Sequence, residues 1–449
     1  MNRNIVDDAL EDIRLNRFHL MILFWCSMLM LFDGYDLVIY GSVLSQLMSE
    51  WQLSPVTAGI IGSSALFGMM IGALTLGSSS DRFGRRRVIL TCLIVFGVAA
   101  LGNGFCENAS QFTVCRFLTG VGLGGMVPNI VALMTEMSPR SKRNIMVTLM
   151  LSFFSVGGVI AAVSGKIVTP SFGWRANFLI AGLPLLTFPL LYRWLPESLS
   201  YLLANGRHAQ AEPILKRFAP EYRGTASGLA ALAGEHDHRP QRSRTVELFT
   251  QGRAADTLLL WIAFGMCMLM VYGLNTWLPK LMSANGYSIG SSLTFLITLN
   301  VGAILGGLFS GWLADRYGGK PTLFMFFAVA ALSIDLLGYK QSPLVLNVLL
   351  MCAGATTIGT LCIVHAFAAQ HYPSAIRSTG VGWAAAAGRL GAVAGPALGG
   401  YLLNERFAIS FSFMVFAIPG VVAAVAVLLI SRSGKALASD AQTLAAPAE

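Results

Sequence analysis

Long apolar stretches alternate with short polar segments along most of the 449-residue chain. A helix that crosses a bilayer needs about 20 mostly apolar residues, and a lone strand in lipid would leave its backbone polar groups unpaired. The pattern therefore predicts an all-α, polytopic membrane protein with twelve transmembrane helices. They are expected near residues 19–43, 57–78, 88–106, 111–134, 145–168, 174–195, 256–280, 291–314, 321–340, 344–370, 376–403 and 410–431.

One long polar segment, at about residues 196–255, separates two sets of six predicted helices. A G-x3-D-R-x-G-R-R loop at residues 77–86 recurs in weaker form at residues 311–320, an offset of 234 (315 minus 81). A duplicated six-helix unit is typical of transporters. We predict an N-terminal half at 1–195, a cytoplasmic linker at 196–255, and a C-terminal half with a cytoplasmic tail at 256–449. Three further matches share the offset: Pro139 with Pro373, Arg143 with Arg377, and Gly165 with Gly399.

Composition and charge support this interpretation and give the orientation. Only 12% of the residues are charged, against about 25% in an ordinary soluble domain. Of the 31 Lys and Arg residues, 24 fall in segments that are cytoplasmic if the N-terminus is inside, and 5 fall in outer segments. Because Lys and Arg accumulate on the cytoplasmic side, both termini are predicted to be cytoplasmic. This asymmetry accounts for the net charge of +9, so nucleic-acid binding is not expected. The polar N-terminal segment predicts no cleavable signal peptide.

Several motifs resemble those of a known transporter family. The G-x3-D-R-x-G-R-R loop, its weaker second copy, the R-F-L-T-G-V-G-L-G-G run that begins at Arg116, and Pro196-Glu197-Ser198 are similar to the major facilitator superfamily. Within helix 1, Asp33-Gly34-Tyr35-Asp36 resembles the D-G-x-D motif of the aromatic acid:proton symporters, of the benzoate and hydroxybenzoate transporter type. The resemblance covers essentially the whole chain and implies a bacterial inner-membrane carrier.

Asp33 and Asp36 are the candidate proton-coupling residues. They are spaced i, i+3 on helix 1, so they share one side of it. A carboxylate within the bilayer is costly unless it faces a cavity or a partner, which makes it a functional candidate. Two close carboxylates also favour retention of a proton. The alternative is that both lie in water at the outer rim, or pair with an arginine to hold helices together.

Arginine and aromatic side chains are the candidate substrate ligands. Arg389 in helix 11 and Arg116 in helix 4 lie within predicted helices, and a guanidinium matches a carboxylate with two hydrogen bonds. Which of them holds the substrate is left open. The alternative for Arg389 is a role as counter-ion for a helix 1 aspartate, and the alternative for Arg116 is a packing partner for helix 1 or a residue that snorkels to the outer surface. Tyr35 and Trp383, on helices 1 and 11, are candidates for stacking on a ring substrate.

The repeated loops between helices 2 and 3 and between helices 8 and 9 are expected to act as a conformational latch. An aspartate at a helix start caps exposed N–H groups, and the neighbouring arginines are expected to pair across to the other half, with Glu136 or Asp315 among the possible partners. Such pairs would hold the cytoplasmic face closed and break as the carrier reverses; the alternative is that the arginines only enforce topology. The latch candidates are Asp81, Arg82, Arg85, Asp315, Arg316 and Glu136.

These features predict uptake of an aromatic monocarboxylate, such as benzoate or a hydroxybenzoate, together with protons and by alternating access. The expected partners are the substrate, protons and lipid, and we expect the carrier to act as a monomer. A transporter of another small organic acid, a drug-type antiporter, and a membrane sensor are the alternatives. An enzyme, a cofactor and a metal site are not expected, since HExxH does not occur and His236 and His238 lie in the polar linker.

Overall fold

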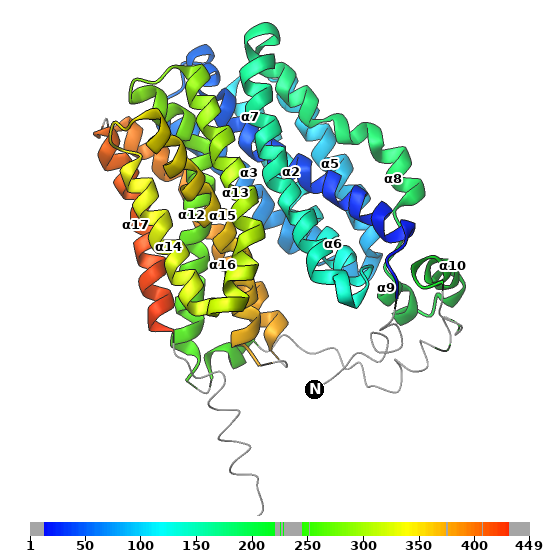
Figure 1. Ribbon diagram of the computed structural model, residues 1–449. Coiled ribbons are helices and arrows are strands. Elements are labelled where there is room, and N and C mark those ends of the chain that lie inside the picture. The colour runs from blue at the N-terminus through cyan, green and yellow to red at the C-terminus, as the bar shows by residue number, and fades with distance from the viewer. Residues whose placement is uncertain are drawn as a thin grey trace, which may run out of the picture. The chain divides into compact units, whose positions relative to one another are not determined.

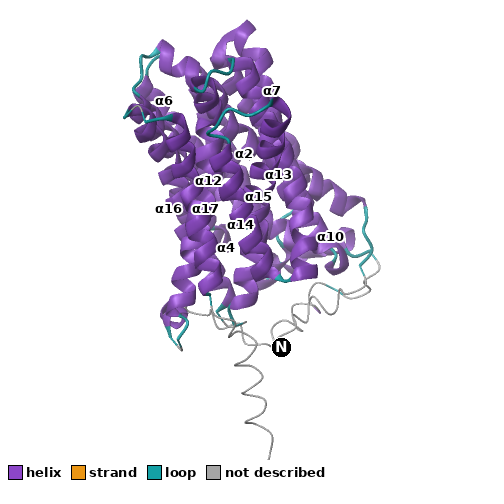
Figure 2. Ribbon diagram, turned by 60° about the vertical axis from the view of Figure 1, so that its left-hand side comes forward, coloured by secondary structure: helices purple, strands orange, loops and turns teal. Residues whose placement is uncertain are grey.

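The computed structural model describes residues 13–220, 225, 228, 245–250, 252–373, 376–405 and 407–430. Every regular element in these residues is a helix (Figure 2), which confirms the predicted all-α class. By their internal contacts the residues form two units. One comprises Met1–Leu53 and Ser64–Pro240, and the other comprises Ser54–Ser63 and Gln241–Glu449.

The first unit contains the N-terminal helices (Figure 1). Its elements are α2 (Arg17–Glu50), the second part of α3 (Pro55–Gly72) with the π-helical Ala73–Gly77, α4 (Ser80–Phe83), α5 (Arg85–Phe105), α6 (Ala109–Glu136), α7 (Arg143–Ala181), α8 (Phe188–Trp194), α9 (Leu199–Ala204) and α10 (His208–Phe218). The predicted linker segment therefore includes two short helices, α9 and α10.

The second unit contains the C-terminal helices and the first turns of α3. Its other elements are the 3₁₀ turn Thr245–Phe249, α12 (Ala254–Ala284), α13 (Ile289–Tyr317), α14 (Gly319–Leu336), α15 (Pro343–His371), α16 (Arg377–Asn404) and α17 (Ile409–Leu429).

The offset found in the sequence also relates the helices. Four helices of the N-terminal set and four of the C-terminal set begin 234 residues apart (289 minus 55), and these are α3 and α13, α5 and α14, α6 and α15, and α7 and α16. Gly84 and Gly318, at the same offset, precede α5 and α14 with φ angles of 91° and 90°. Residues with side chains rarely adopt such angles, so both copies of the loop require glycine. The two halves are therefore repeats in structure as well as in sequence.

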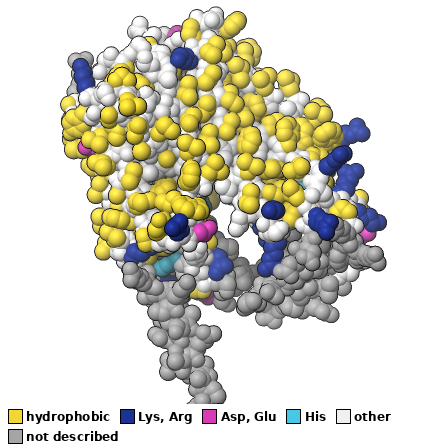
Figure 3. All heavy atoms as spheres, viewed as in Figure 1, with side chains coloured by type: hydrophobic (Ala, Val, Ile, Leu, Met, Phe, Trp, Pro, Cys, Tyr) yellow, Lys and Arg dark blue, Asp and Glu magenta, His cyan; other side chains and the backbone are white. Residues whose placement is uncertain are grey.

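Ten helices of the described residues are long and apolar enough to cross a membrane. One of them, α7, contains the predicted span 145–168 and the start of the predicted span 174–195, and Gly173, with a φ of 76°, breaks the helix between them. The second span continues through the 3₁₀ turn Leu183–Thr187 and α8. Helix α16, rich in glycine and alanine, matches the predicted helix at 376–403 and is not among the ten. Large hydrophobic side chains such as Leu186 and Leu344 are exposed, as expected of lipid-facing surfaces. In Figure 3 such side chains dominate the visible face, and Lys and Arg gather near α8–α10.

Helix α2 extends beyond its predicted end. The prediction placed the end at residue 43, where polar residues begin to alternate with apolar ones, and the helix continues to Glu50. Leu44 and Leu47 remain fully buried in this last part, and packing of that side maintains the helix although its other side is polar.

Two glycines bring α2 and α7 into close contact. A Cβ atom on Gly34 would lie 1.8 Å from the carbonyl oxygen of Phe154, and one on Gly157 would lie 1.8 Å from that of Leu31. Real Cβ atoms do not approach oxygen so closely, and only glycine permits this approach of the two helices. The packing of Gly34 fixes which side of α2 faces α7, and with it the direction of the two neighbouring aspartates.

Candidate functional site

The two predicted proton-coupling residues lie in the middle of α2, far from both of its ends. Asp33 is 4% exposed and Asp36 is 2% exposed, so both carboxyl groups are buried within the protein. This excludes, for the described structure, the alternative that both lie in water at the rim. A buried carboxylate is stable only with a partner or a proton, because burial removes its hydration.

Arg116 of α6 is the partner of Asp36. Its Nη1 donates to Asp36 Oδ2 at 2.8 Å, and the side chain of each residue is at most 3% exposed. The Cζ of Arg116 also lies 5.3 Å from the centre of the Tyr40 ring. Asp36 and Arg116 were predicted separately, and of the two arginines only Arg389 was considered as a counter-ion for an aspartate of this helix; the structure instead pairs Arg116 with Asp36.

The Asp36–Arg116 pair retains unused hydrogen-bonding capacity. Asp36 Oδ1 and Arg116 Nε are buried, and neither has a hydrogen-bond partner among the described residues. Buried polar atoms are rarely left in this state, and an exception calls for an explanation in terms of function. An oxygen that accepts nothing has room for a proton, and an N–H that donates to nothing has room for another acceptor. The pair can therefore exchange partners.

Tyr35 anchors α2 to α7. Its hydroxyl group lies 3.1 Å from Ser164 Oγ and 3.1 Å from the carbonyl oxygen of Asn177, and Ser164 Oγ in turn donates to Asn177 Oδ1 at 2.6 Å. The ring is 1% exposed. An anchoring role accounts for these contacts, and stacking of Tyr35 on a substrate stays a prediction.

The other two substrate candidates belong to the second unit. Arg389 of α16 is partly exposed and lies close enough to His365 of α15 for their charges to interact. The ring of His365 contacts Phe264 edge-on, with centroids 4.8 Å apart. Trp383 stacks on Trp261, with centroids 5.8 Å apart, and is 44% exposed. The second unit thus also presents a cation beside aromatic rings.

Two of the latch candidates, Arg85 and Glu136, belong to a compact network within the first unit. Arg85 donates to Glu136 at the end of α6, and Glu136 accepts from the Ser198 hydroxyl at 2.8 Å and from the Ser200 N–H at 2.6 Å. Glu197 Oε1 accepts from the Arg86 N–H at 3.0 Å and so caps the start of α5. The network joins the α4–α5 loop, α6 and α9. Arg85 and Glu136, considered above for pairing across the halves, pair within one unit.

The remaining latch candidates are more open. Arg82, Asp315 and Arg316 are exposed, and Arg316 lies over the rings of Trp312 and Tyr317. Asp81 is part of α4, and its side chain is outside the described structure. His236 and His238 also lie outside the described residues.

Two groups of interacting residues were not predictable from sequence motifs. One is the capping role of Glu197 and Ser198, which had been noted only as part of a family motif. The other is a contact between Asp256 near the start of α12 and His371 at the end of α15, with Oδ2 of Asp256 and Nε2 of His371 3.3 Å apart. Neither residue stands in a recognisable motif, and only the packing of α12 on α15 places them together.

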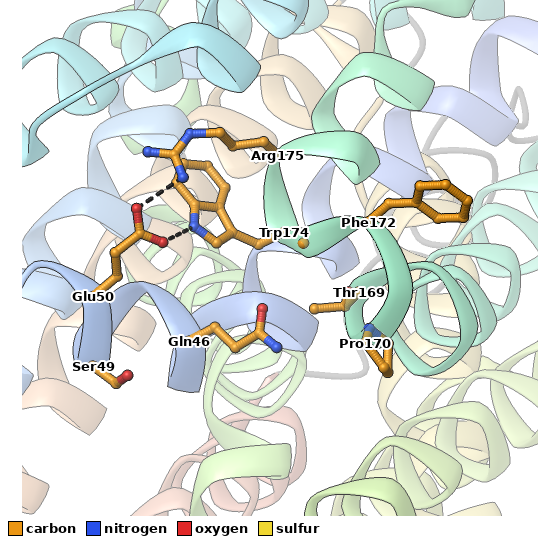
Figure 4. Close-up of a pocket in the computed structure, with 9 residues that line it drawn as sticks. Gln46, Ser49, Glu50, Thr169, Pro170, Phe172, Trp174 and Arg175 are labelled. Carbon is orange, nitrogen blue, oxygen red and sulfur yellow. Dashed lines mark hydrogen bonds and ion pairs between the residues drawn. The ribbon is translucent and has the colours of Figure 1, made fainter.

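The first unit also contains a cavity of about 370 Å³. It lies between the last turns of α2 and the bend of α7, and Gln46, Glu50, Thr169 and Trp174 are among its lining residues (Figure 4). Glu50 accepts from the Trp174 indole N–H at 2.6 Å and from Arg175 Nη1 at 2.8 Å. These bonds fasten the α7 bend to the end of α2.

Comparison with known proteins identifies the family. The family model described as "Major Facilitator Superfamily" matches residues 26–334 and, in a second match, residues 260–447. The chain belongs to this superfamily. It is a multi-pass membrane transporter and not an enzyme, and the predicted fold class and family are confirmed.

Two relatives and one solved structure illustrate the similarity. The chain is 40% identical to the benzoate transport protein of Acinetobacter baylyi, over 96% of this chain and 94% of the relative. It is 35% identical to the gentisate transporter of Corynebacterium glutamicum, over 90% of this chain and 86% of the relative. The inward-open structure of the xylose transporter XylE from E. coli aligns with a TM-score of 0.74 at 19% identity, over 94% of this chain and 99% of that one. The last comparison supports the fold alone.

Proposed function

We propose that this transporter takes up an aromatic monocarboxylate, such as benzoate or a hydroxybenzoate, together with protons. The two relatives described above support the substrate class, since they carry the names of a benzoate and a gentisate transporter. The excess of basic residues in the segments assigned to the inside supports an inner-membrane location with cytoplasmic termini. We further propose that the carrier functions as a monomer.

The observation that carries the mechanism is the buried Asp36–Arg116 pair with its two unpaired polar atoms. In the empty carrier the two charges neutralise each other. A proton from the outside binds the free oxygen of Asp36, and the carboxyl group becomes neutral. Arg116 is then a buried cation without its counter-ion, and the carboxylate of the substrate replaces Asp36 by accepting hydrogen bonds from the guanidinium.

This exchange couples the two cargoes. A proton alone leaves Arg116 uncompensated, and a substrate anion alone competes with the Asp36 carboxylate for one guanidinium. Both part-loaded states carry an unbalanced buried charge, whereas the empty and fully loaded carriers do not. We propose that only these two balanced states change readily between outward-open and inward-open forms, since a ligand shifts a conformational equilibrium through its differential affinity.

The other predicted residues have supporting roles in this proposal. Asp33 lies one turn from Asp36 and is a second proton-coupling group. Arg389, with His365 beside it, is the second candidate for the substrate carboxylate. Arg82, Arg85, Asp315, Arg316, Glu136 and Asp81 form the proposed conformational latch.

Uptake measurements in cells that express the protein test the proposal. We expect saturable uptake of radiolabelled benzoate or 4-hydroxybenzoate, which an uncoupler of the proton gradient abolishes. Asp36→Asn is expected to abolish uphill accumulation. Asp335→Asn, which removes a carboxylate from the membrane helix α14, is the matched control and is expected to accumulate substrate as wild type does.

The outcomes separate the parts of the proposal. Absence of uptake of either acid by well-expressed wild type contradicts the substrate class. Uptake that survives both the uncoupler and Asp36→Asn retains the substrate but contradicts proton coupling through Asp36. An equal loss in the Asp335→Asn control would indicate a general effect of removing membrane carboxylates.

A further inference from the structure

Tyr40 and Phe112 lie beside the ion pair, each one helical turn from one of its members. On α2, Tyr40 follows Asp36 by four residues, and on α6, Phe112 precedes Arg116 by four. Residues four apart on a helix lie on one face, one turn apart. The contacts between these faces of the two antiparallel helices therefore fall into two layers, one turn apart along the helices. One layer contains the ion pair. The other contains the stacked rings of Tyr40 and Phe112, whose centroids lie 6.3 Å apart and whose planes are inclined by 28°.

The Tyr40 ring contacts both layers, since it lies against Phe112 and against Arg116. The Cζ of Arg116 lies 5.3 Å from its centroid, a distance at which the face of an aromatic ring attracts a guanidinium. Tyr40 is 2% exposed and Arg116 is 2% exposed, so water does not screen this attraction. The carbonyl oxygen of Asp36 adds a weak contact to Arg116 Nη1 at 3.4 Å.

The Tyr40 ring is itself held by an aromatic cluster. Phe112 is fully buried and contacts Trp51, Trp174 and Phe178 edge-on, with centroid distances of 5.5, 5.7 and 5.2 Å. Trp174 is fixed in turn by its hydrogen bond to Glu50 at the cavity of Figure 4. Rings packed on all sides cannot turn aside easily, so the orientation of the Tyr40 face is set by its surroundings.

We propose that Tyr40 is a positioning residue for substrate recognition. It holds the guanidinium of Arg116 in place when Asp36 is protonated, so that the substrate carboxylate meets an oriented cation. Protonation removes the ion pair but leaves the ring face and the Asp36 carbonyl oxygen as partners of Arg116. This inference rests on the proposed function, because it requires that Arg116 receive the carboxylate.

Equilibrium binding of radiolabelled benzoate to the purified full-length protein in nanodiscs tests the role of Tyr40. Tyr40→Phe retains the ring face, and we expect its Kd to stay within about twofold of wild type. Tyr40→Leu removes the face and is expected to raise the Kd about tenfold, as loss of a desolvated cation–π contact would. Phe96→Leu is the matched control, a fully buried aromatic of α5, and is expected to bind as wild type does.

A second comparison separates positioning from packing. In an Asp36→Asn background, which imitates the protonated state, Tyr40→Leu should raise the Kd by a larger factor than in wild type, since fewer contacts then hold Arg116. A packing role predicts the same factor in both backgrounds.

Three results would overturn the inference, namely wild-type binding by Tyr40→Leu, equal weakening by Tyr40→Phe and Tyr40→Leu, and equal factors in the two backgrounds. Failure of wild type itself to bind benzoate or 4-hydroxybenzoate would overturn the proposed function and this inference with it.

Discussion

The two repeats differ at the positions that carry the buried ion pair. At the offset of 234 residues (270 minus 36), Asp36 corresponds to Met270 and Arg116 corresponds to Leu350. Met270 and Leu350 are fully buried on α12 and α15, which correspond to α2 and α6. The same scaffold is therefore built once with a charged pair and once with two apolar side chains.

The stacked aromatic rings beside the ion pair also occur in the first repeat and not at the corresponding positions of the second. Tyr40 corresponds to Leu274 and Phe112 to Leu346, and each of these leucines is 1% exposed. Leucine fills the space but offers no face to a cation. The second repeat folds without a charged pair or aromatic rings at these positions, so the stability of the fold does not require them. The difference between the repeats therefore indicates that the charged pair and the rings serve function.

The second repeat has a carboxylate–histidine contact elsewhere on the corresponding helices. Asp256 is the third residue of α12 and His371 is the last residue of α15, with side chains 10% and 8% exposed. Asp256 and His371 lie at helix ends, whereas Asp36 lies in mid-helix, where a charged pair is costly unless both charges are balanced. Position along the helix thus separates a structural pair from a functional one.

The largest expected effect comes from making the first repeat resemble the second. The single change Arg116→Leu leaves the buried Asp36 charge unpaired, and we expect a loss of about 3–5 kcal/mol of stability and of all uptake. The double change Asp36→Met with Arg116→Leu removes both charges, and we expect stability near that of wild type but no uptake.

Thermal unfolding in detergent and uptake of labelled benzoate measure both effects. Met270→Leu in the second repeat is the control and should retain both properties. A double variant that unfolds as easily as the single one would mean that the pair is structural, and the comparison between the repeats would fail.

Two glycines, one in each repeat, extend the comparison of the repeats to helix packing. Gly34→Ala would place a Cβ 1.8 Å from the Phe154 carbonyl oxygen, whereas Gly265→Ala on α12 meets no atom within 4 Å. We expect Gly34→Ala to separate α2 from α7, with at least about 2 kcal/mol lost and uptake strongly reduced, and Gly265→Ala to be nearly neutral. Expression level, thermal stability and uptake of both variants are the measurements. Equal behaviour of the two would contradict the close α2–α7 contact.

The helix-end pair is expected to matter less than the mid-helix pair. Asp256→Asn should lower stability by about 1 kcal/mol, because an uncharged amide replaces the carboxylate that contacts His371, and uptake should stay within about threefold of wild type. Thermal unfolding and uptake kinetics of Asp256→Asn beside Asp36→Asn give the comparison directly. Loss of uptake in Asp256→Asn as complete as in Asp36→Asn would remove the distinction drawn between the two pairs.

The smallest expected effect is that of Tyr35→Phe. The hydroxyl group contributes hydrogen bonds between α2 and α7, and its loss should cost about 1 kcal/mol of stability with KM for benzoate unchanged within about twofold. Unfolding and uptake kinetics test this. A KM several times higher at unchanged stability would instead support the predicted contact of Tyr35 with substrate.

The helices were predictable because their signal is local. Apolar length placed nearly every span, and the errors occurred where tertiary packing overrides local pattern, as at the end of α2 beyond residue 43. Asp33, Asp36, Arg116 and Arg389 were recognisable singly, since a charge in an apolar helix is costly and therefore conspicuous. Their partners were not predictable, because pairing depends on the rotation and register of one helix against another.

The amino-acid sequence alone determined the membrane class, the duplication at a fixed offset, the orientation preferred by its basic residues and the candidate charges. These depend on composition and on spacing along the chain, which need no coordinates. Only the tertiary structure decided that Asp36 pairs with Arg116, that Gly34 serves the contact with α7, and that Tyr40 lies against the guanidinium. Each of these depends on which faces of two distant helices meet, and that is a property of packing.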